Sequence, residues 1–257
     1  PGPGRVAEVL GPMVEQGRLL LWTGNEDIDA ALVATGLLGA LPRGGTGDFM
    51  SLRVANSAPN KLDTYLSRTL DYDVAYEPRT GRVDATLTVR LHNAAPDGLP
   101  SYASSNRALR AEEEGAPPDG TIMAFVSLYS GLELDRALVG GRMVAVEIMP
   151  EFGHRTYSIP IQVPRGQTVE MVFHLEGSVE RDLYTLDVVG QPLGDPEVLH
   201  LSVRTTDATL LVPYVVATRA PGQPQVVVDV GRAQSGAVLW EGPIERSMRF
   251  LLGPDLD

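Results

Sequence analysis

The stretch TLDYDVAYEPRTGRVDATLTVRLH, residues 69–92, decides the fold, because apolar and polar residues alternate strictly on both sides of a turn-forming segment. A period of two places neighbouring side chains on opposite faces of a strand. If the turn spans residues 77–82, the apolar residues of the two strands face each other. The predicted cross-strand pairs are Tyr76 with Val83, Val74 with Ala85, Tyr72 with Leu87, and Leu70 with Val89.

Similar alternation recurs at residues 122–128, 142–148, 155–163, 169–175, 183–188 and 198–203, with turn-forming residues between the runs. Pro160 cannot donate to a strand ladder and therefore predicts an edge position or a bulge. The spacing is typical of an immunoglobulin-like antiparallel β-sandwich, expected over residues 49–205. Runs at 210–216, 226–230, 237–240 and 248–252 predict a C-terminal β extension over residues 206–257.

The first 48 residues have a different pattern and predict a small α/β segment. Apolar residues from Val6 to Val14 recur at helical spacing, and Gly17 stands where a helix C-cap is expected. Residues 19–22 predict a short buried strand. Asn25 is suited to N-cap a second helix, and residues 42–48 predict a flexible connector.

The composition excludes several classes of partner and chemistry. Asp and Glu number 33 against 21 Lys and Arg, so the net charge of −12 opposes binding to nucleic acid or anionic lipid. Cysteine is absent, which excludes disulfides, thiol nucleophiles and thiolate metal sites. No signal-peptide pattern follows Pro1, and no apolar run approaches the ~20 residues of a membrane span. We expect no membrane insertion by this fragment.

The motifs of common catalytic sites are missing. The chain has no phosphate-binding loop, no G-x-S-x-G elbow and no helical His pair for zinc. Among acidic residues only Glu147 and Asp187 interrupt apolar runs, and both are expected to point outward. We therefore assign no catalytic residue and no cofactor.

Four histidines could still meet in space. His92, His174 and His200 fall on the polar side of their strands, and His154 is expected in a turn. If two of them faced each other on neighbouring strands, they could bind a metal or act as a pH switch.

Asp71 and Asp73, with Glu77 nearby, lie on one solvated strand face. Two carboxylates at this spacing could hold calcium through hard oxygen ligands. The alternative is an ordinary salt-bridged outer face, with the opposing strand supplying the residues Thr86, Thr88 and Arg90.

Residues 93–120 show no period and contain several prolines and the acidic run 112–114. Connections beyond about 15 residues are usually either functional or disordered. This segment is either surface decoration or a loop that binds a partner.

One family resemblance emerges from residues 17–23 (GRLLLWT), 26–41, 54–66 (VANSAPNKLDTYL) and 93–100 (NAAPDGLP). The chain resembles the C-terminal region of an envelope family of high-GC Gram-positive bacteria that carries the domain of unknown function 4012. The resemblance implies an N-terminal membrane anchor and a further half upstream, with this segment outside the cytoplasm in the cell envelope. Parts of that upstream half look similar to glycopolymer transferases that attach polymers to peptidoglycan, and the arginines and aspartates that would perform this reaction are not in this chain.

Within the NKLDTYL motif, Asn60, Lys61, Asp63 and Tyr65 are candidate ligand-binding residues. The alternative interpretation is structural: Asn60 and Asp63 cap a turn that delivers Tyr65 into the core.

Three functions are compatible with these features. The first is a non-catalytic binding or scaffolding module of a membrane-anchored envelope protein, whose partners are the upstream half, other envelope proteins or glycopolymers. The second is the accessory half of a glycopolymer-processing enzyme whose catalytic part lies upstream. The third is calcium-dependent adhesion through Asp71 and Asp73.

Overall fold

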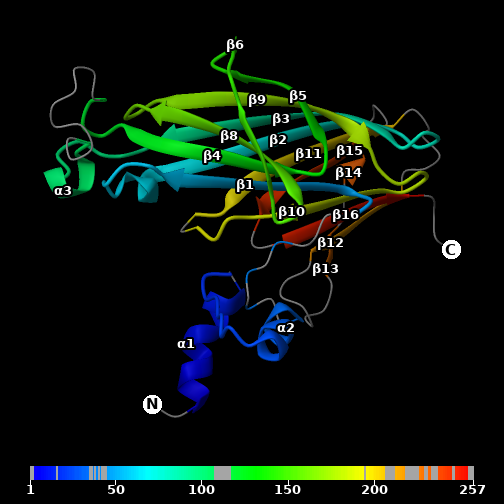
Figure 1. Ribbon diagram of the computed structural model, residues 1–257, viewed down its shortest axis with the longest axis horizontal. Helices are drawn as coiled ribbons and strands as arrows, with labels where there is room; N and C mark the ends of the chain where they lie inside the picture. The colour runs from blue at the N-terminus through cyan, green and yellow to red at the C-terminus, as the bar shows by residue number, and fades with distance from the viewer. Residues whose placement is uncertain are drawn as a thin grey trace.

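A computed structural model describes residues 3–15, 17–34, 37, 39, 41, 45–106, 117–193, 195–205, 212–217, 226–228, 231–232, 237–244 and 247–253. The fold is mainly β and consists of two eight-stranded sheets that face each other (Figure 1). In spatial order, the first sheet contains β13 (Val226–Val228), β12 (Val212–Ala217), β16 (Ser247–Gly253), β10 (Tyr184–Val189), β1 (Asp48–Asn56), β4 (Ile122–Ser130), β8 (His154–Val163) and β7 (Glu147–Glu151). The second contains β14 (Gly231–Arg232), β15 (Ala237–Ile244), β11 (Glu197–Thr205), β2 (Leu66–Glu77), β3 (Arg82–Asn93), β9 (Thr168–Ser178), β5 (Glu133–Val139) and β6 (Arg142–Met143).

The predicted hairpin is confirmed as β2 and β3 at the centre of the second sheet, in the predicted register. Tyr76 pairs with Val83 and Tyr72 with Leu87, and all four side chains are buried. The alternation predicted the register because a slip by one residue would turn this entire apolar face toward water.

Both sheets are mixed, whereas we expected antiparallel pairing throughout. β1 runs parallel to β10, and β11 runs parallel to β2. A period of two determines which side chains share a face, but the direction of a neighbouring strand depends on how the connections cross between the sheets.

One hydrophobic core fills the space between the sheets, and the inward residues of both contribute to it. The predicted C-terminal strands extend this core, because β15 pairs with β11 and β16 pairs with β10. The rings of Trp240 and Phe250, one from each sheet, meet edge to face with centroids 5.2 Å apart. The predicted residues 210, 211, 229 and 230 lie outside the described residues.

The run 142–148, predicted as one strand, is divided between two sheets. Its start forms β6 in the second sheet and its end enters β7 in the first, so the chain crosses the sandwich edge between them. The alternation missed β5, which pairs with β9 through a register shift after Leu134. Pro160 lies beyond the part of β8 that pairs with β7, so β8 is an edge strand there, as predicted.

The N-terminal segment contains α1 (Pro3–Glu15) and α2 (Glu26–Ala34), which lie outside the two sheets (Figure 1). Gly17 has a φ of 68°, as a C-cap glycine should, and Asn25 Oδ1 accepts hydrogen bonds from Asp27 N and Ile28 N. The strand predicted at 19–22 was wrong: these residues form no strand, and Trp22 is 80% exposed. An apolar run becomes a strand only beside another strand, and none lies next to it among the described residues.

The connection 93–120 contains the short helix α3 (Ser101–Ser104). Its acidic run at 112–114 lies outside the described residues. Residues 42–44 of the predicted N-terminal connector also lie outside them. Across the described part of the chain, every helix is too short or too polar to cross a membrane.

Candidate functional site

The NKLDTYL motif forms a tight turn anchored by Asn60, followed by the 3₁₀ helix η1 (Leu62–Tyr65). The Asn60 side chain is 3% exposed, and its Oδ1 accepts hydrogen bonds from Leu62 N at 3.2 Å and Asn56 Nδ2 at 2.9 Å. Its Nδ2 donates to Asn106 Oδ1 at 2.7 Å. Asn60 therefore joins the turn to the middle of the long connection at residues 93–120.

Two further asparagine contacts hold this connection against the sandwich. Asn106 Nδ2 donates to Thr121 O at 2.9 Å. Asn93 is fully buried, and its Nδ2 donates to Gly120 O at 2.8 Å and Val163 O at 2.9 Å. These buried amides satisfy backbone carbonyls that would otherwise lose their hydrogen bonds to water.

The four candidate residues of the motif differ widely in exposure, and Asn60 is buried. Lys61 and Asp63 are exposed, and Tyr65 is half-buried against the core. The residue that the turn delivers fully into the core is Leu62. The contacts favour the structural interpretation of Asn60 and Asp63, whose carboxylate accepts a hydrogen bond from Asn56 at 3.3 Å.

Asp71 takes part in a row of alternately acidic and basic side chains across five strands of the second sheet. We call this row the charge ladder: Glu241, His200, Asp71, Arg90 and Glu170. His200 Nδ1 lies 2.5 Å from Asp71 Oδ1, and His200 Nε2 lies 3.6 Å from Glu241 Oε1. Arg90 Nη1 donates to Asp71, and Arg90 Nε donates to Glu170 Oε2 at 3.0 Å. Partial burial raises the pKa of Asp71, but hydrogen bonds from His200 and Arg90 outweigh it and lower the pKa overall.

Asp73 is the second residue of the calcium hypothesis. Its exposed side chain forms no hydrogen bond or ion pair with the described residues. Both oxygens of Asp71 are already engaged, one by Arg90 and the other by His200. The described residues contain no group of three or more His, Asp or Glu side chains placed to hold a metal ion. The arrangement therefore matches the salt-bridged outer face, the alternative to the calcium site.

Three shallow depressions follow one another over this outer face. The first has a volume of about 500 Å³ and is lined by Asp71, Asp73, Arg90 and His200, among others. The second, of about 340 Å³, shares Asp73 with the first. The third, of about 410 Å³, shares Ala75, Asp84 and Arg204 with the second. We call these three neighbouring depressions together the outer groove.

Three histidines lie on the outer face of this sheet, as predicted, and two of them pair with threonines across strands. His92 Nδ1 lies 3.0 Å from Thr168 Oγ1, and His174 Nδ1 lies 3.3 Å from Thr86 Oγ1. The fourth, His154, was wrongly placed in a turn: it begins β8, is buried, and stacks on Phe49 at a centroid distance of 3.9 Å.

A buried carboxylate that the pattern analysis missed lies at the start of β1. Asp48 Oδ2 accepts hydrogen bonds from Tyr72 Oη at 2.6 Å and Tyr184 Oη at 2.7 Å, and its Oδ1 accepts one from Phe49 N at 2.7 Å. Complete burial raises the pKa of Asp48 to about 6, although all three donors oppose the shift. The carboxyl joins residues of both sheets inside the core.

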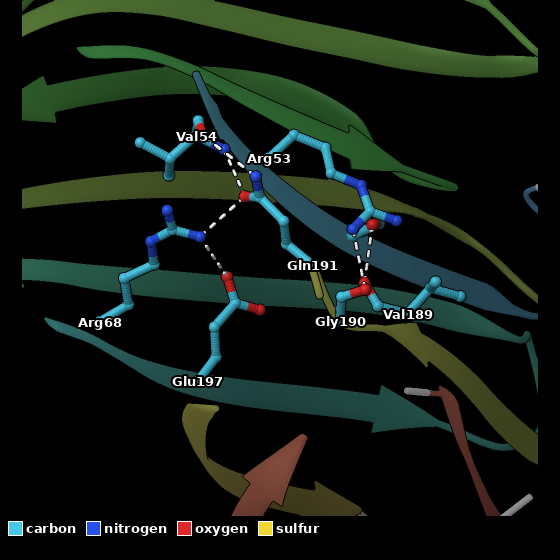
Figure 2. Close-up of polar contacts among 8 residues, drawn as sticks. Arg53, Val54, Arg68, Val189, Gly190, Gln191 and Glu197 are labelled. Carbon is cyan, nitrogen blue, oxygen red and sulfur yellow. Dashed lines mark hydrogen bonds and ion pairs between the residues drawn. The ribbon is translucent and has the colours of Figure 1, made fainter. Parts of the chain in front are cut away.

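A second buried cluster surrounds Arg68 and Glu197 where β10 ends and the chain crosses to β11 (Figure 2). Arg68 Nη1 donates to Gln191 Oε1 at 2.7 Å and to Glu197 Oε1 at 3.3 Å, and the two charged side chains are 3% and 1% exposed. Burial raises the pKa of Glu197, and the Arg68 charge only partly offsets this effect.

Gln191 closes the sheet beside this ion pair. Its amide accepts a hydrogen bond from Val54 N at 2.9 Å and donates one to Val54 O at 3.1 Å, so it takes the place of a neighbouring strand (Figure 2). Arg53 Nη1 donates to Gly190 O at 2.8 Å in the same crossing segment. The cluster thus supports the chain where it leaves one sheet for the other.

The periodicity of the sequence could have identified these buried charged residues, because each stands at an inward-facing position of its strand. Arg68 stands in the inward phase between Leu66 and Leu70, and Glu197 precedes the inward Leu199. Asp48 similarly precedes Met50 in phase. A charged residue in the apolar phase of a strand indicates a buried polar contact, but its partner comes from a distant strand that alternation cannot identify.

Comparisons with known proteins give no family assignment. No family model matches the chain, and no curated protein matches it. Among solved structures, a protein described as nutrient-binding from Legionella pneumophila has a TM-score of 0.45 and 7% identity, covering 80% of this chain and 71% of its own. An M1 zinc metallopeptidase from Deinococcus radiodurans has a TM-score of 0.36 and 12% identity, with 74% of this chain and 42% of the peptidase covered. These similarities are too low to bear on function.

Proposed function

We propose that this chain is a binding and scaffolding module of a bacterial cell-envelope protein, held outside the cytoplasm by an anchor upstream. The resemblance of residues 17–23, 54–66 and 93–100 to the family of domain of unknown function 4012 supports this proposal. An immunoglobulin-like relationship is part of the proposal. It is supported by the antiparallel β2–β3–β9 ladder, which shares one hydrophobic core with the sheet that contains the antiparallel pair β4–β8.

The observation that carries the binding role is the outer groove. The buried charges of Asp48, Arg68 and Glu197 are paired inside the core, where they support packing. The outer groove, in contrast, offers solvent-accessible carboxylate, guanidinium and imidazole groups on a rigid central sheet. A preorganised polar surface of this kind is suited to recognition.

A second candidate, the accessory half of a glycopolymer-processing enzyme, is favoured by the apolar surface of the N-terminal segment. Its exposed apolar side chains are Val9, Leu10, Met13, Leu20, Leu21, Trp22, Ile28 and Val33. Isolated helices of this length are only marginally stable in water, so a surface of this kind favours packing against another domain. The upstream half of the same protein is the partner that we propose.

Sedimentation with isolated cell walls tests the binding role. After centrifugation with cell walls from which native proteins have been removed, the purified chain should be found in the pellet with the walls. A soluble control protein of the same net charge should stay in the supernatant. Recovery of the chain in the supernatant at every wall concentration would contradict the proposal.

The second candidate function is tested separately, by an assay of whether the full-length protein turns over lipid-linked glycopolymer. Turnover by the full-length protein, lost when the exposed N-terminal apolar residues are replaced by serine, supports the accessory role. Absence of turnover by the full-length protein argues against it.

A further inference from the structure

We infer that the outer groove binds a neutral, hydroxyl-rich polysaccharide, with Asp73 as a central contact; this inference rests on the binding role proposed above. Asp73 lines both the first and the second depressions and therefore lies between them, where a ligand that occupies both would contact it.

The shape of the groove favours a polymer over a single sugar. The first and second depressions share Asp73, and the second and third share Asp84 and Arg204. Together the three depressions cover the outer faces of several neighbouring strands. Each depression has a volume of a few hundred Å³, so an extended chain can occupy them in sequence.

The chemistry of the groove matches sugar hydroxyls. The charge ladder already satisfies part of the hydrogen-bonding capacity of Asp71, Arg90 and His200 and holds these side chains in place. The side chains of Asp73 and Ser202 line the first depression and form no hydrogen bonds with the described residues. A hydroxyl can donate to a carboxylate and accept from a guanidinium, so neighbouring sugar hydroxyls suit this mixture of groups.

The charge of the groove opposes binding of a polyanionic polymer. Carboxylates outnumber guanidiniums six to three along the first two depressions: Asp71, Asp73, Asp84, Asp135, Glu176 and Glu241 against Arg90, Arg136 and Arg204. This excess is part of the net charge of −12 and repels phosphate- or uronate-containing polymers. A neutral glycan avoids the repulsion.

Titration calorimetry of the purified chain tests the inference. The probes are neutral galactan, arabinan and mannan fragments, a poly(glycerol phosphate) and poly-lysine. At least one neutral fragment should bind, and the variant Asp73→Ala should weaken its binding about tenfold, as expected for loss of a charge-assisted hydrogen bond. Ser202→Ala is a second groove variant, for which we expect weaker binding in the same direction.

The matched control is Glu147→Ala, which removes an exposed carboxylate from the edge strand β7 of the other sheet. It should leave binding unchanged, and thermal melts should show that all three variants fold. Equal binding by the wild type and both groove variants would overturn the groove assignment. Preference for poly(glycerol phosphate) or poly-lysine would overturn the ligand class. Sedimentation with walls but no affinity for any neutral fragment would overturn this inference and leave the binding role standing, whereas failure of both assays would remove both.

Discussion

Single charged residues in the core distinguish this sandwich from a purely apolar one. Asp48 joins Tyr72 and Tyr184, and Arg68 joins Glu197, each by contacts between strands that lie far apart in the chain. A buried ion pair adds little net stability compared with apolar packing, but removal of one member leaves an uncompensated charge. We attribute to these groups the alignment of the two sheets rather than a chemical reaction.

Asp48 predicts a pH dependence of stability. Its pKa is raised in the fold from an ordinary 3.8 to about 6, so its stabilising contribution is complete below pH 3.8 and is lost as the pH rises through 6. Between pH 4 and 7, the free energy of unfolding of the wild type should therefore fall relative to that of Asp48→Asn, by up to about 3 kcal/mol. Urea unfolding of both proteins at several pH values measures the difference. Parallel stability curves would contradict the assignment.

At the scale of elements, alternation predicted the β2–β3 hairpin to the residue, because both strands bury one face and a short turn connects them. It failed for residues 142–148, where the chain leaves one sheet for the other and a single apolar run serves two strands. The motif at residues 60–65 was found from sequence, but its role depends on Asn106, which is brought close by the intervening connection. Local patterns contain no information about such a contact.

Asn60→Ala should loosen the attachment of the long connection. It removes the hydrogen bonds to Leu62 N and Asn106 and leaves the buried Asn106 amide with one partner fewer, which costs roughly 1–3 kcal/mol. Urea unfolding should show this loss, and amide hydrogens of residues 101–106 should exchange faster.

Lys61→Ala is the matched control, since Lys61 is exposed and its contact to Ala103 uses only the backbone N–H. Equal destabilisation by the two substitutions would show that the Asn60 side chain does not anchor the connection.

At the scale of the whole molecule, the sandwich and the N-terminal segment differ in how they are stabilised. The core cluster runs from Met50 to Leu252 and draws on both sheets, whereas α1 and α2 expose most of their described apolar side chains. The C-terminal strands complete both sheets and contribute Trp240 and Phe250 to the core.

Deletion of residues 1–44 should therefore leave the sandwich folded, with a melting temperature within a few degrees of that of the full chain. Circular dichroism and calorimetric melts measure this, and the deletion should also reduce binding of an apolar dye, because the exposed apolar surface is removed. A deletion variant that fails to fold would show that the helices are required for the core. The complementary deletion of residues 237–257 should prevent folding, since it removes β15 and β16 from both sheets.

The amino-acid sequence alone determined the mainly β character, the central hairpin with its register, the helix caps at Gly17 and Asn25, and the polar placement of three histidines. These features follow from local periodicity and local hydrogen bonding, which act between residues close in the chain. Only the tertiary structure decided the parallel pairs, the buried partners of Asp48 and Arg68, and the position of the outer groove. Each of these depends on which distant strands become neighbours, and that choice is made by packing of the whole core and by the crossings between sheets.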